Sequence, residues 1–179
     1  YAEQCRAQGP VYGVHMGDMT QSEAWGKYTI AHFRDDSTCE VPLFCAMGNH
    51  DHDKEHFDNA LQYSSFAEFN YHAQDAYEKH FGPADYSFNR GDVHIVCMRD
   101  MLWDWDTNKI EDSKSSSGEY GGFLDEQVEW LRQDLANVSK DKKVIICVHI
   151  PLTRSYNSKP NIKTVVDMIA EYNEPQILS

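Results

Sequence analysis

Short apolar runs alternate with longer polar stretches along this chain, and the runs carry the β-branched and aromatic residues that favour buried strands. The predicted strands lie at residues 11–16, 41–47, 86–88, 93–98 and 144–148. Apolar residues at helical spacing occur in several of the stretches between them. The predicted helices lie at residues 22–33, 65–81, 125–135 and 162–172. Strands that alternate with helices predict an α/β layered fold.

Two polar stretches follow a different pattern. Residues 89–92 are Asn-Arg-Gly-Asp between two strand-like runs, which predicts a hairpin turn rather than an adhesion signal. Residues 99–122 show no hydrophobic period, and we expect a long surface loop there. Trp103 and Trp105 lie in this loop, where they either anchor it to the surface or form part of a lid over a substrate.

The size and charge of the chain limit the functions it can have. With 179 residues, of which 41% are hydrophobic, it is long enough for one well-packed domain. Its 29 acidic and 16 basic residues give a net charge of −13, which argues against nucleic acid as a partner. No run is long enough for a membrane-spanning helix. Phosphate substrates remain compatible with this charge, because bound metal ions reverse the local field.

The five cysteines indicate core thiols rather than a disulfide framework. No pair has C-x-x-C spacing, and an odd number cannot pair fully within the chain. Cys45, Cys97 and Cys147 lie inside apolar runs, where a free thiol packs as a small hydrophobic side chain. Such cysteines fit a cytoplasmic and an exported protein equally well.

Side chains of the kind that bind metals follow three of the predicted strands. Asp18 comes after the first strand, Asn49, His50 and Asp51 follow the second, and His149 follows the most apolar one. Open α/β sheets bind their ligands at the C-terminal ends of the strands. A carboxylate, an amide oxygen and an imidazole form a mixed donor set that suits Mn, Fe, Zn or Mg.

Each of these residues has an ordinary structural explanation when it is taken alone. A Gly-Asp pair is typical of a turn, and Asn or Asp commonly caps a helix. A single histidine after a strand is usually a hydrogen-bonded structural residue. Their occurrence together at three strand ends favours a common site instead.

With these motifs the sequence resembles the calcineurin-like metallophosphoesterase superfamily from about residue 11 onward. The matching segments are Gly17-Asp18, Gly48-Asn49-His50-Asp51 and His149-Ile150-Pro151-Leu152. The resemblance implies a sandwich of two β-sheets flanked by helices, with a two-metal centre between the sheets. It also implies a metal-dependent phosphoester hydrolase, either a phosphatase or a phosphodiesterase, in which a metal-bound hydroxide attacks a small-molecule phosphoester.

The resemblance assigns a role to each matching residue. Asp18 corresponds to the carboxylate that bridges the two metal ions, and Asn49 and His149 correspond to ligands of one of them. His50 corresponds to the acid that protonates the leaving oxygen or steadies the phosphoryl group, and Asp51 to its orienting partner. Two divalent cations about 3.5–4 Å apart can hold both the attacking and the leaving oxygen of an in-line displacement.

Two motifs of the family pattern are not found in this sequence, an upstream Asp-x-His and a downstream Gly-His-x-His. We therefore expect residues 1–179 to form a single domain, the central part of a longer protein and truncated at both ends. One metal would retain three of its four protein ligands, Asp18, Asn49 and His149, and the other would retain Asp18. The alternatives are a non-catalytic scaffold and a one-metal binding domain of the same fold.

Several other residues carry weaker functional signals. Arg99, Arg154 and Lys159 are candidates for contacting a phosphate, and Arg154 is the best placed because it closely follows the third ligand-bearing strand. Surface charge is the ordinary explanation for all three. His15 and His94 lie within predicted strands, where packed and hydrogen-bonded histidines are expected.

Overall fold

The computed structural model describes residues 12–19, 42–51, 74, 77–79, 81–103, 119–152 and 161–179. Its described elements follow the predicted alternation. They are β1 (Gly13–His15), β2 (Leu43–Cys45), a 3-10 turn (Asn49–Asp51), β3 (Tyr86–Arg90), β4 (Val93–Cys97), β5 (Met101–Trp103), β6 (Glu119–Gly121), α5 (Asp125–Leu135), β7 (Lys143–Cys147), α6 (Ile162–Ile169) and β8 (Asn173–Leu178).

The five predicted strands are confirmed, with ends that differ by one or two residues, and so is the helix at 125–135. The helix predicted at 162–172 is confirmed as well, but it ends three residues earlier, at Ile169. The predicted helix at 65–81 is confirmed at its described positions, which are helical at residues 74, 77–79 and 81. The predicted helix at 22–33 lies outside the described residues.

The largest sheet has the strand order β3-β4-β7-β8. Strands β3 and β4 form the predicted antiparallel hairpin, and Gly91 in its turn has a φ of 58°, which a glycine adopts without strain. The β4–β7 and β7–β8 pairs are parallel. The ends of β4 and β7 therefore lie at the same edge of this sheet.

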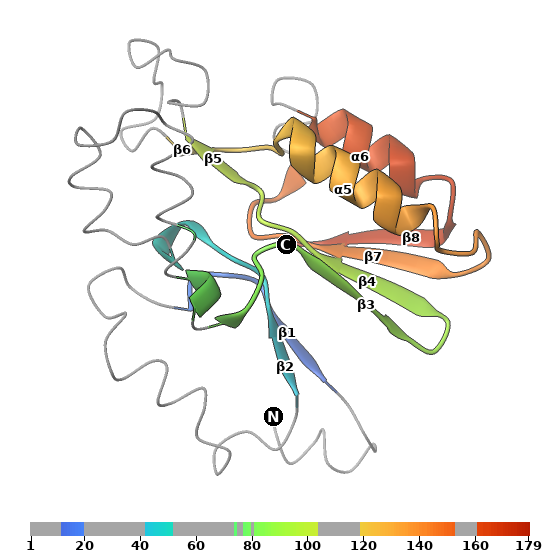
Figure 1. Ribbon diagram of the computed structural model, residues 1–179, viewed down its shortest axis with the longest axis horizontal. Helices are drawn as coiled ribbons and strands as arrows, with labels where there is room; N and C mark the ends of the chain where they lie inside the picture. Colours follow the sequence, from blue (N-terminus) through green and yellow to red (C-terminus); the bar gives the residue numbers. More distant parts are fainter. Residues whose placement is uncertain are drawn as a thin grey trace.

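Helices α5 and α6 cover one face of the four-stranded sheet (Figure 1). Val96 of β4 and Ile146 of β7 face the helices and are buried with Leu131 of α5 and Val165 of α6. Because side chains alternate across a strand, every second residue of β4 and β7 faces this layer. None of the helices in the described part of the chain is long and apolar enough to cross a membrane.

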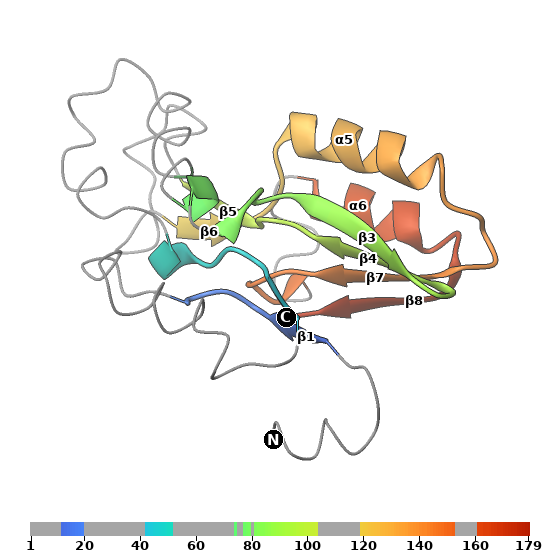
Figure 2. The same cartoon turned by 60° about the horizontal axis from the view of Figure 1, so that its bottom comes forward.

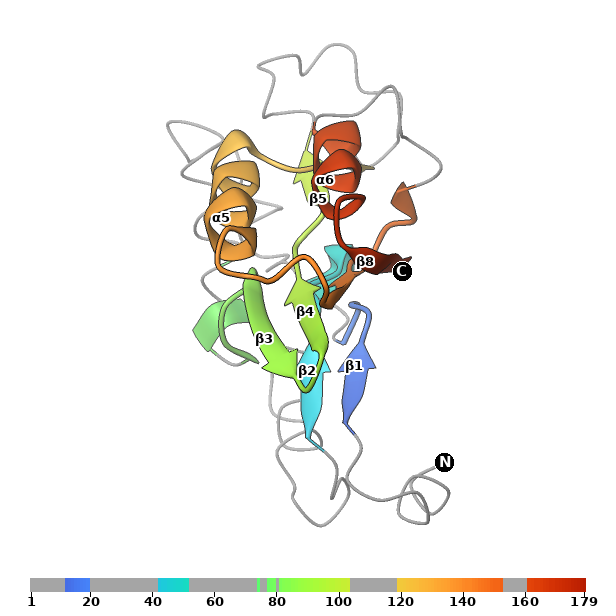
Figure 3. The same ribbon diagram turned by 90° about the vertical axis from the view of Figure 1, so that its right-hand side faces the viewer.

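The opposite face of the four-stranded sheet packs against the parallel β1–β2 pair, as the layers in Figure 2 and the side view in Figure 3 show. Ile95, Cys97 and Cys147 lie buried in this second layer with residues of β1. Phe44 of β2 stacks on Phe88 of β3 with ring centroids 4.0 Å apart. The α/β fold with two sheets and flanking helices is confirmed, and these cysteines are core thiols.

The expectation of a long surface loop over residues 99–122 is wrong at both ends. Met101–Trp103 and Glu119–Gly121 form an antiparallel strand pair, β5–β6, beside the main sheet. Arg99 is buried, and its guanidinium Nη1 donates to the carbonyl oxygen of Met101 at 3.2 Å. Arg99 therefore serves the packing of this segment and is no surface contact for a phosphate. Residues 104–118, including Trp105, lie outside the described residues.

Candidate metal centre

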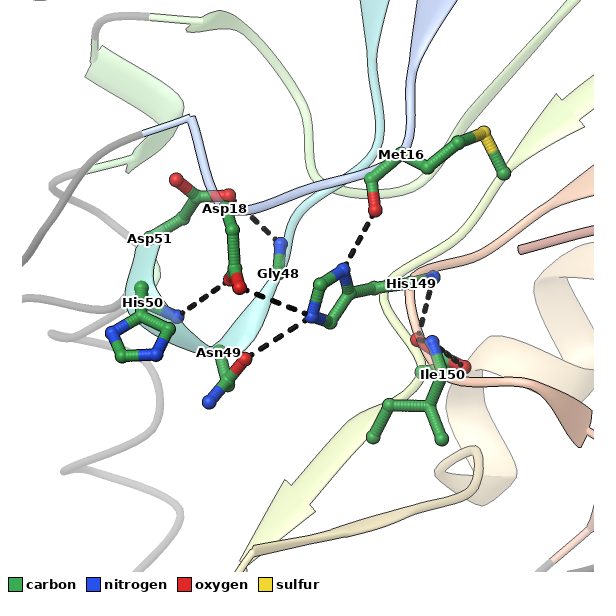
Figure 4. Close-up of polar contacts among 9 residues, drawn as sticks. Met16, Asp18, Gly48, Asn49, His50, Asp51, His149 and Ile150 are labelled. Carbon is green, nitrogen blue, oxygen red and sulfur yellow. Dashed lines mark hydrogen bonds and ion pairs between the residues drawn. The ribbon is translucent and has the colours of Figure 1, made fainter. Parts of the chain in front are cut away.

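The ends of three strands bring the predicted site residues together (Figure 4). Asp18 follows β1, and Asn49 lies in the 3-10 turn after β2. Strands β1 and β2 are parallel, so both residues lie at the same edge of their sheet. His149 follows β7 of the other sheet and points toward them. The candidate centre is thus built from both sheets.

Three side chains meet at the Nε2 atom of His149. This atom lies 3.1 Å from Oδ1 of Asn49 and 3.5 Å from Oδ2 of Asp18. The other carboxylate oxygen of Asp18, Oδ1, accepts a hydrogen bond from the backbone N–H of His50 at 3.0 Å. Asp18 and His149 both remain partly exposed, with 34% and 21% of their side chains accessible. The centre is therefore open to a ligand from solvent.

The second ring nitrogen of His149 determines what the first can do. Nδ1 lies 2.7 Å from the carbonyl oxygen of Met16, which accepts a hydrogen bond and has none to donate. With its proton on Nδ1, a neutral imidazole presents the lone pair of Nε2 to the oxygens of Asn49 and Asp18. Three lone-pair donors that face one another fit a cation between them, and a metal-binding histidine commonly donates its other N–H to a carbonyl.

The candidate centre includes the amide oxygen of Asn49 among its donors, so it differs from metal sites built only of His, Cys, Asp and Glu side chains. No three residues of those four types come together as a metal site within the described ranges. Asp18 and His149 contribute two such side chains, and Asn49 completes the set. One carboxylate, one amide and one imidazole suit a divalent cation such as Mn, Fe, Zn or Mg.

Two glycines allow the strand ends to approach so closely. Gly17 has a φ of 99°, and a Cβ atom there would lie 2.6 Å from Nδ1 of His149. A Cβ atom on Gly48 would lie 2.4 Å from both the backbone nitrogen and Oδ1 of Asp18. The glycines of the Gly-Asp and Gly-Asn-His-Asp motifs are therefore required by the contact between the two loops.

The turn that carries Asn49 is stabilised by hydrogen bonds between its own residues. Asp51 is fully buried, and its Oδ2 accepts a hydrogen bond from the N–H of Gly48 at 2.8 Å. The N–H of Asp51 donates in return to the carbonyl oxygen of Gly48 at 3.2 Å. His50, which precedes Asp51 in the turn, is exposed. Asp51 thus stabilises the turn, and its predicted effect on the His50 ring stays a prediction.

Comparison with known families agrees with this geometry. Residues 1–178 match the sequence profile of the family described as calcineurin-like phosphoesterase. The chain belongs to this family. Calcineurin-like phosphoesterases are in general hydrolases of phosphoesters that depend on divalent metal ions. The family resemblance drawn from the three motifs is confirmed. A comparison with curated proteins gives no significant match.

Sequence reasoning missed one residue that supports the site of this phosphoesterase. Asp100 is fully buried, and its carboxylate accepts hydrogen bonds from the backbone N–H groups of His149 and Ile150. Burial raises the pKa of Asp100 to about 7, although the two N–H groups act in the opposite direction. The sequence held an indication of this role, because Asp100 follows one predicted strand as His149 follows another. These strands are β4 and β7, whose last residues, Cys97 and Cys147, are partners in the sheet.

The remaining candidates lie apart from the centre or outside the described ranges. His94 is buried, with its ring nitrogens 3.2 Å from Oδ1 of Asn89 and 2.7 Å from Oδ2 of Asp134, so the expectation of a packed histidine is confirmed. His15 is half-buried in β1. Arg154 and Lys159 are not among the described residues.

Proposed function

We propose that this calcineurin-like phosphoesterase hydrolyses small-molecule phosphoesters at a two-metal centre. In this proposal Asp18, Asn49 and His149 are metal ligands, and Asp18 is shared between the two ions. The observation that carries it is the approach of Oδ1 of Asn49 and Oδ2 of Asp18 to Nε2 of His149, whose other ring nitrogen lies 2.7 Å from the carbonyl oxygen of Met16.

In this proposal each residue of the centre has a separate role around the bound ions. When present, a pair of divalent cations polarises the phosphoryl group and activates a water molecule for in-line attack. Asp18 directs Oδ2 toward His149, and the His50 N–H holds its Oδ1, so the orientation of the carboxylate that would hold the ions is fixed. Met16 holds the His149 ring through Nδ1, which leaves Nε2 directed at Asn49 and Asp18.

His50 is the residue best placed to assist the leaving group. Its backbone N–H is bound to Asp18, so its position is tied to the centre, while its side chain is exposed to solvent and to a substrate. An imidazolium at this place donates a proton to the leaving oxygen, and a neutral ring remains to be reprotonated by water. Asp51, buried behind the turn, holds His50 in place through Gly48.

The test uses the full-length protein, stripped of metal with a chelator and reloaded with Mn²⁺. We expect hydrolysis of p-nitrophenyl phosphate or bis(p-nitrophenyl) phosphate to be lost on chelation and restored by the metal. Comparison of these two substrates separates a phosphatase from a phosphodiesterase. Elemental analysis after desalting counts the ions, and the proposal expects two per chain.

Variants connect that activity to the candidate centre. Asn49→Ala and His149→Ala should both lower the retained metal and the rate, whereas His50→Ala should lower the rate and leave the metal content unchanged. Asn137→Ala is the matched control, because Asn137 is an exposed asparagine that donates to Gln133 in the last turn of α5. Full activity of the Asn49→Ala variant with wild-type metal content would refute the proposal.

A one-metal binding domain is the competing function. It is favoured by the observation that three donors, rather than a larger set, gather among the described residues. This alternative expects about one ion per chain, lost in His149→Ala, and no hydrolysis of either substrate. A protein that retains no metal at all would instead be a scaffold of the same fold.

A further inference from the structure

The hydrogen bonds of β7 end immediately before His149. The N–H of Val148 still donates to Leu178 of β8, at 3.0 Å. The next two N–H groups, those of His149 and Ile150, turn instead to the carboxylate of Asp100, at 3.0 Å and 2.9 Å. The chain therefore leaves the sheet at the residue that carries the imidazole, and one buried carboxylate replaces the neighbouring strand as its partner.

Two consecutive N–H groups on one carboxylate fix the backbone on both sides of the His149 Cα atom. The direction in which the side chain leaves the backbone is thereby set, and the contact of Nδ1 with Met16 sets the rotation of the ring. Small shifts matter in such a site, because a metal ligand must stay close to its productive geometry.

Asp100 is itself held from several directions. Its carbonyl oxygen accepts from the N–H of Gly122, at 2.9 Å. The preceding residue, Arg99, donates its N–H to Asp85 at 2.8 Å and accepts at its carbonyl oxygen from Nε2 of Gln127 at 2.7 Å. Gln127 belongs to α5, so the carboxylate is supported by the helix layer rather than by a free loop.

We propose that Asp100 is a positioning residue that holds the backbone of His149 so that Nε2 reaches Asn49 and Asp18. The inference rests on the proposed function, because it takes His149 to be a metal ligand. Outer residues that orient a metal ligand commonly change metal affinity about 10–100-fold when they are replaced. Asp100 acts through His149 and has no part in the chemical step itself.

The first test measures Mn²⁺ binding by the Asp100→Asn variant of the metal-depleted full-length protein. The electron paramagnetic resonance signal of free Mn²⁺ reports how much of the ion stays unbound. Asparagine keeps the shape of the side chain but replaces one of the two accepting oxygens with an NH₂ group that faces a backbone N–H. We expect binding that is about 10–100-fold weaker. Asp134→Asn is the matched control, since Asp134 accepts from Ser87 and contacts His94, and none of these residues belongs to the candidate centre. It should lower stability and leave the Mn²⁺ affinity unchanged.

The second test is hydrogen exchange in the metal-free wild-type protein, which does not depend on metal binding. The N–H groups of His149 and Ile150 should be protected to a degree similar to those of β7, and Asp100→Asn should expose these two selectively. A wild-type protein that binds no Mn²⁺ refutes the proposed function, and the exchange data then decide the role of Asp100 alone. If Asp100→Asn does not fold, the wild-type exchange decides it as well.

Two results would overturn the inference. One is a folded Asp100→Asn protein whose Mn²⁺ affinity stays within about twofold of the wild type, well below the effect expected of an orienting residue. The other is rapid exchange of the His149 and Ile150 N–H groups in the wild-type protein, since a carboxylate that does not protect them cannot fix the backbone.

Discussion

Nε2 of His149 lies 3.1 Å from Oδ1 of Asn49, although 100 positions separate the two residues in the sequence. Asn49 belongs to the turn after β2, and His149 follows β7, so this contact joins the two sheets of the sandwich. A change that shifts one sheet against the other therefore alters the candidate metal centre. The geometry of the centre depends on the packing between the sheets.

Replacement of Gly48 by alanine tests the close approach of the two loops. The added methyl group would lie 2.4 Å from the backbone nitrogen and Oδ1 of Asp18, so the loops must separate. We expect a loss of about 1–3 kcal/mol in the free energy of unfolding, as for other overpacked sites. Urea unfolding measures this loss, and elemental analysis after Mn²⁺ loading should show less retained metal.

Gly91→Ala is the control for that variant. Gly91 has a positive φ in the β3–β4 turn, but no atom lies within 4 Å of the place a methyl group would take, so the variant adds backbone strain without a clash. It should cost about 1–2 kcal/mol, as for other L-residues in the left-handed region, and leave metal retention unchanged. Equal metal loss in both variants would show that the approach of Gly48 to Asp18 is not what matters.

Tyr86 and Tyr77 should differ in their effects on stability, although both hydroxyl groups contact Cys45. The Tyr86 hydroxyl donates to the carbonyl oxygen of Cys45 and also accepts from its N–H, at 2.8 Å. The Tyr77 hydroxyl donates to the same carbonyl oxygen at 3.1 Å. Tyr86→Phe leaves the N–H of Cys45 without this acceptor and should cost about 1–3 kcal/mol. Tyr77→Phe should cost less, and urea unfolding of the two variants provides the comparison.

Asp85 should make the stability of the protein depend on pH. Burial raises the pKa of its carboxyl group above the usual 3.8, against the opposing effects of Arg99 and Gln127. The folded state therefore binds a proton more tightly than the unfolded state, and the associated stability is lost as the pH rises from about 4 through the raised pKa. The slope is at most about 1.4 kcal/mol per pH unit.

The difference between wild type and Asp85→Asn isolates this contribution, because the other ionisable groups are common to both proteins. Urea unfolding at a series of pH values should show the wild type losing stability relative to the variant as the pH rises. A difference that stays constant with pH would mean that Asp85 has the same pKa in the folded and unfolded states.

The hydrophobic pattern predicted the central strands because β4 and β7 are buried on both faces. Val96 and Ile146 face the helices, whereas Ile95 and Cys147 face the β1–β2 pair, so residues 95–98 and 144–148 are continuously apolar. The ligand-type residues stood out because they interrupt such runs at their ends. Pattern alone therefore predicted an α/β layered fold and the strand ends at which Asp18, Asn49 and His149 lie, whereas the two-sheet sandwich was implied by the family resemblance.

The support of the site could not be predicted in the same way. The burial of the polar residues Asp85, Arg99 and Gln127 depends on partners that are distant in the chain, such as the bond from Gln127 to Asp85. The short β5–β6 pair was missed for the same reason. Spacing also gave no indication that Gly48 contacts Asp18, because that approach depends on how the two loops pack.

The reactivity of the thiols between the sheets can report on metal binding at the centre, although these thiols are not part of it. Cys97 and Cys147 are free, buried and adjacent on β4 and β7. The hydrogen bond to Cys97, together with burial, raises the pKa of Cys147, so its reactive thiolate is scarce until the layers separate. A cation held by Asp18 and His149 would fasten one sheet to the other. It would therefore slow the alkylation of two sulfur atoms with which it makes no contact.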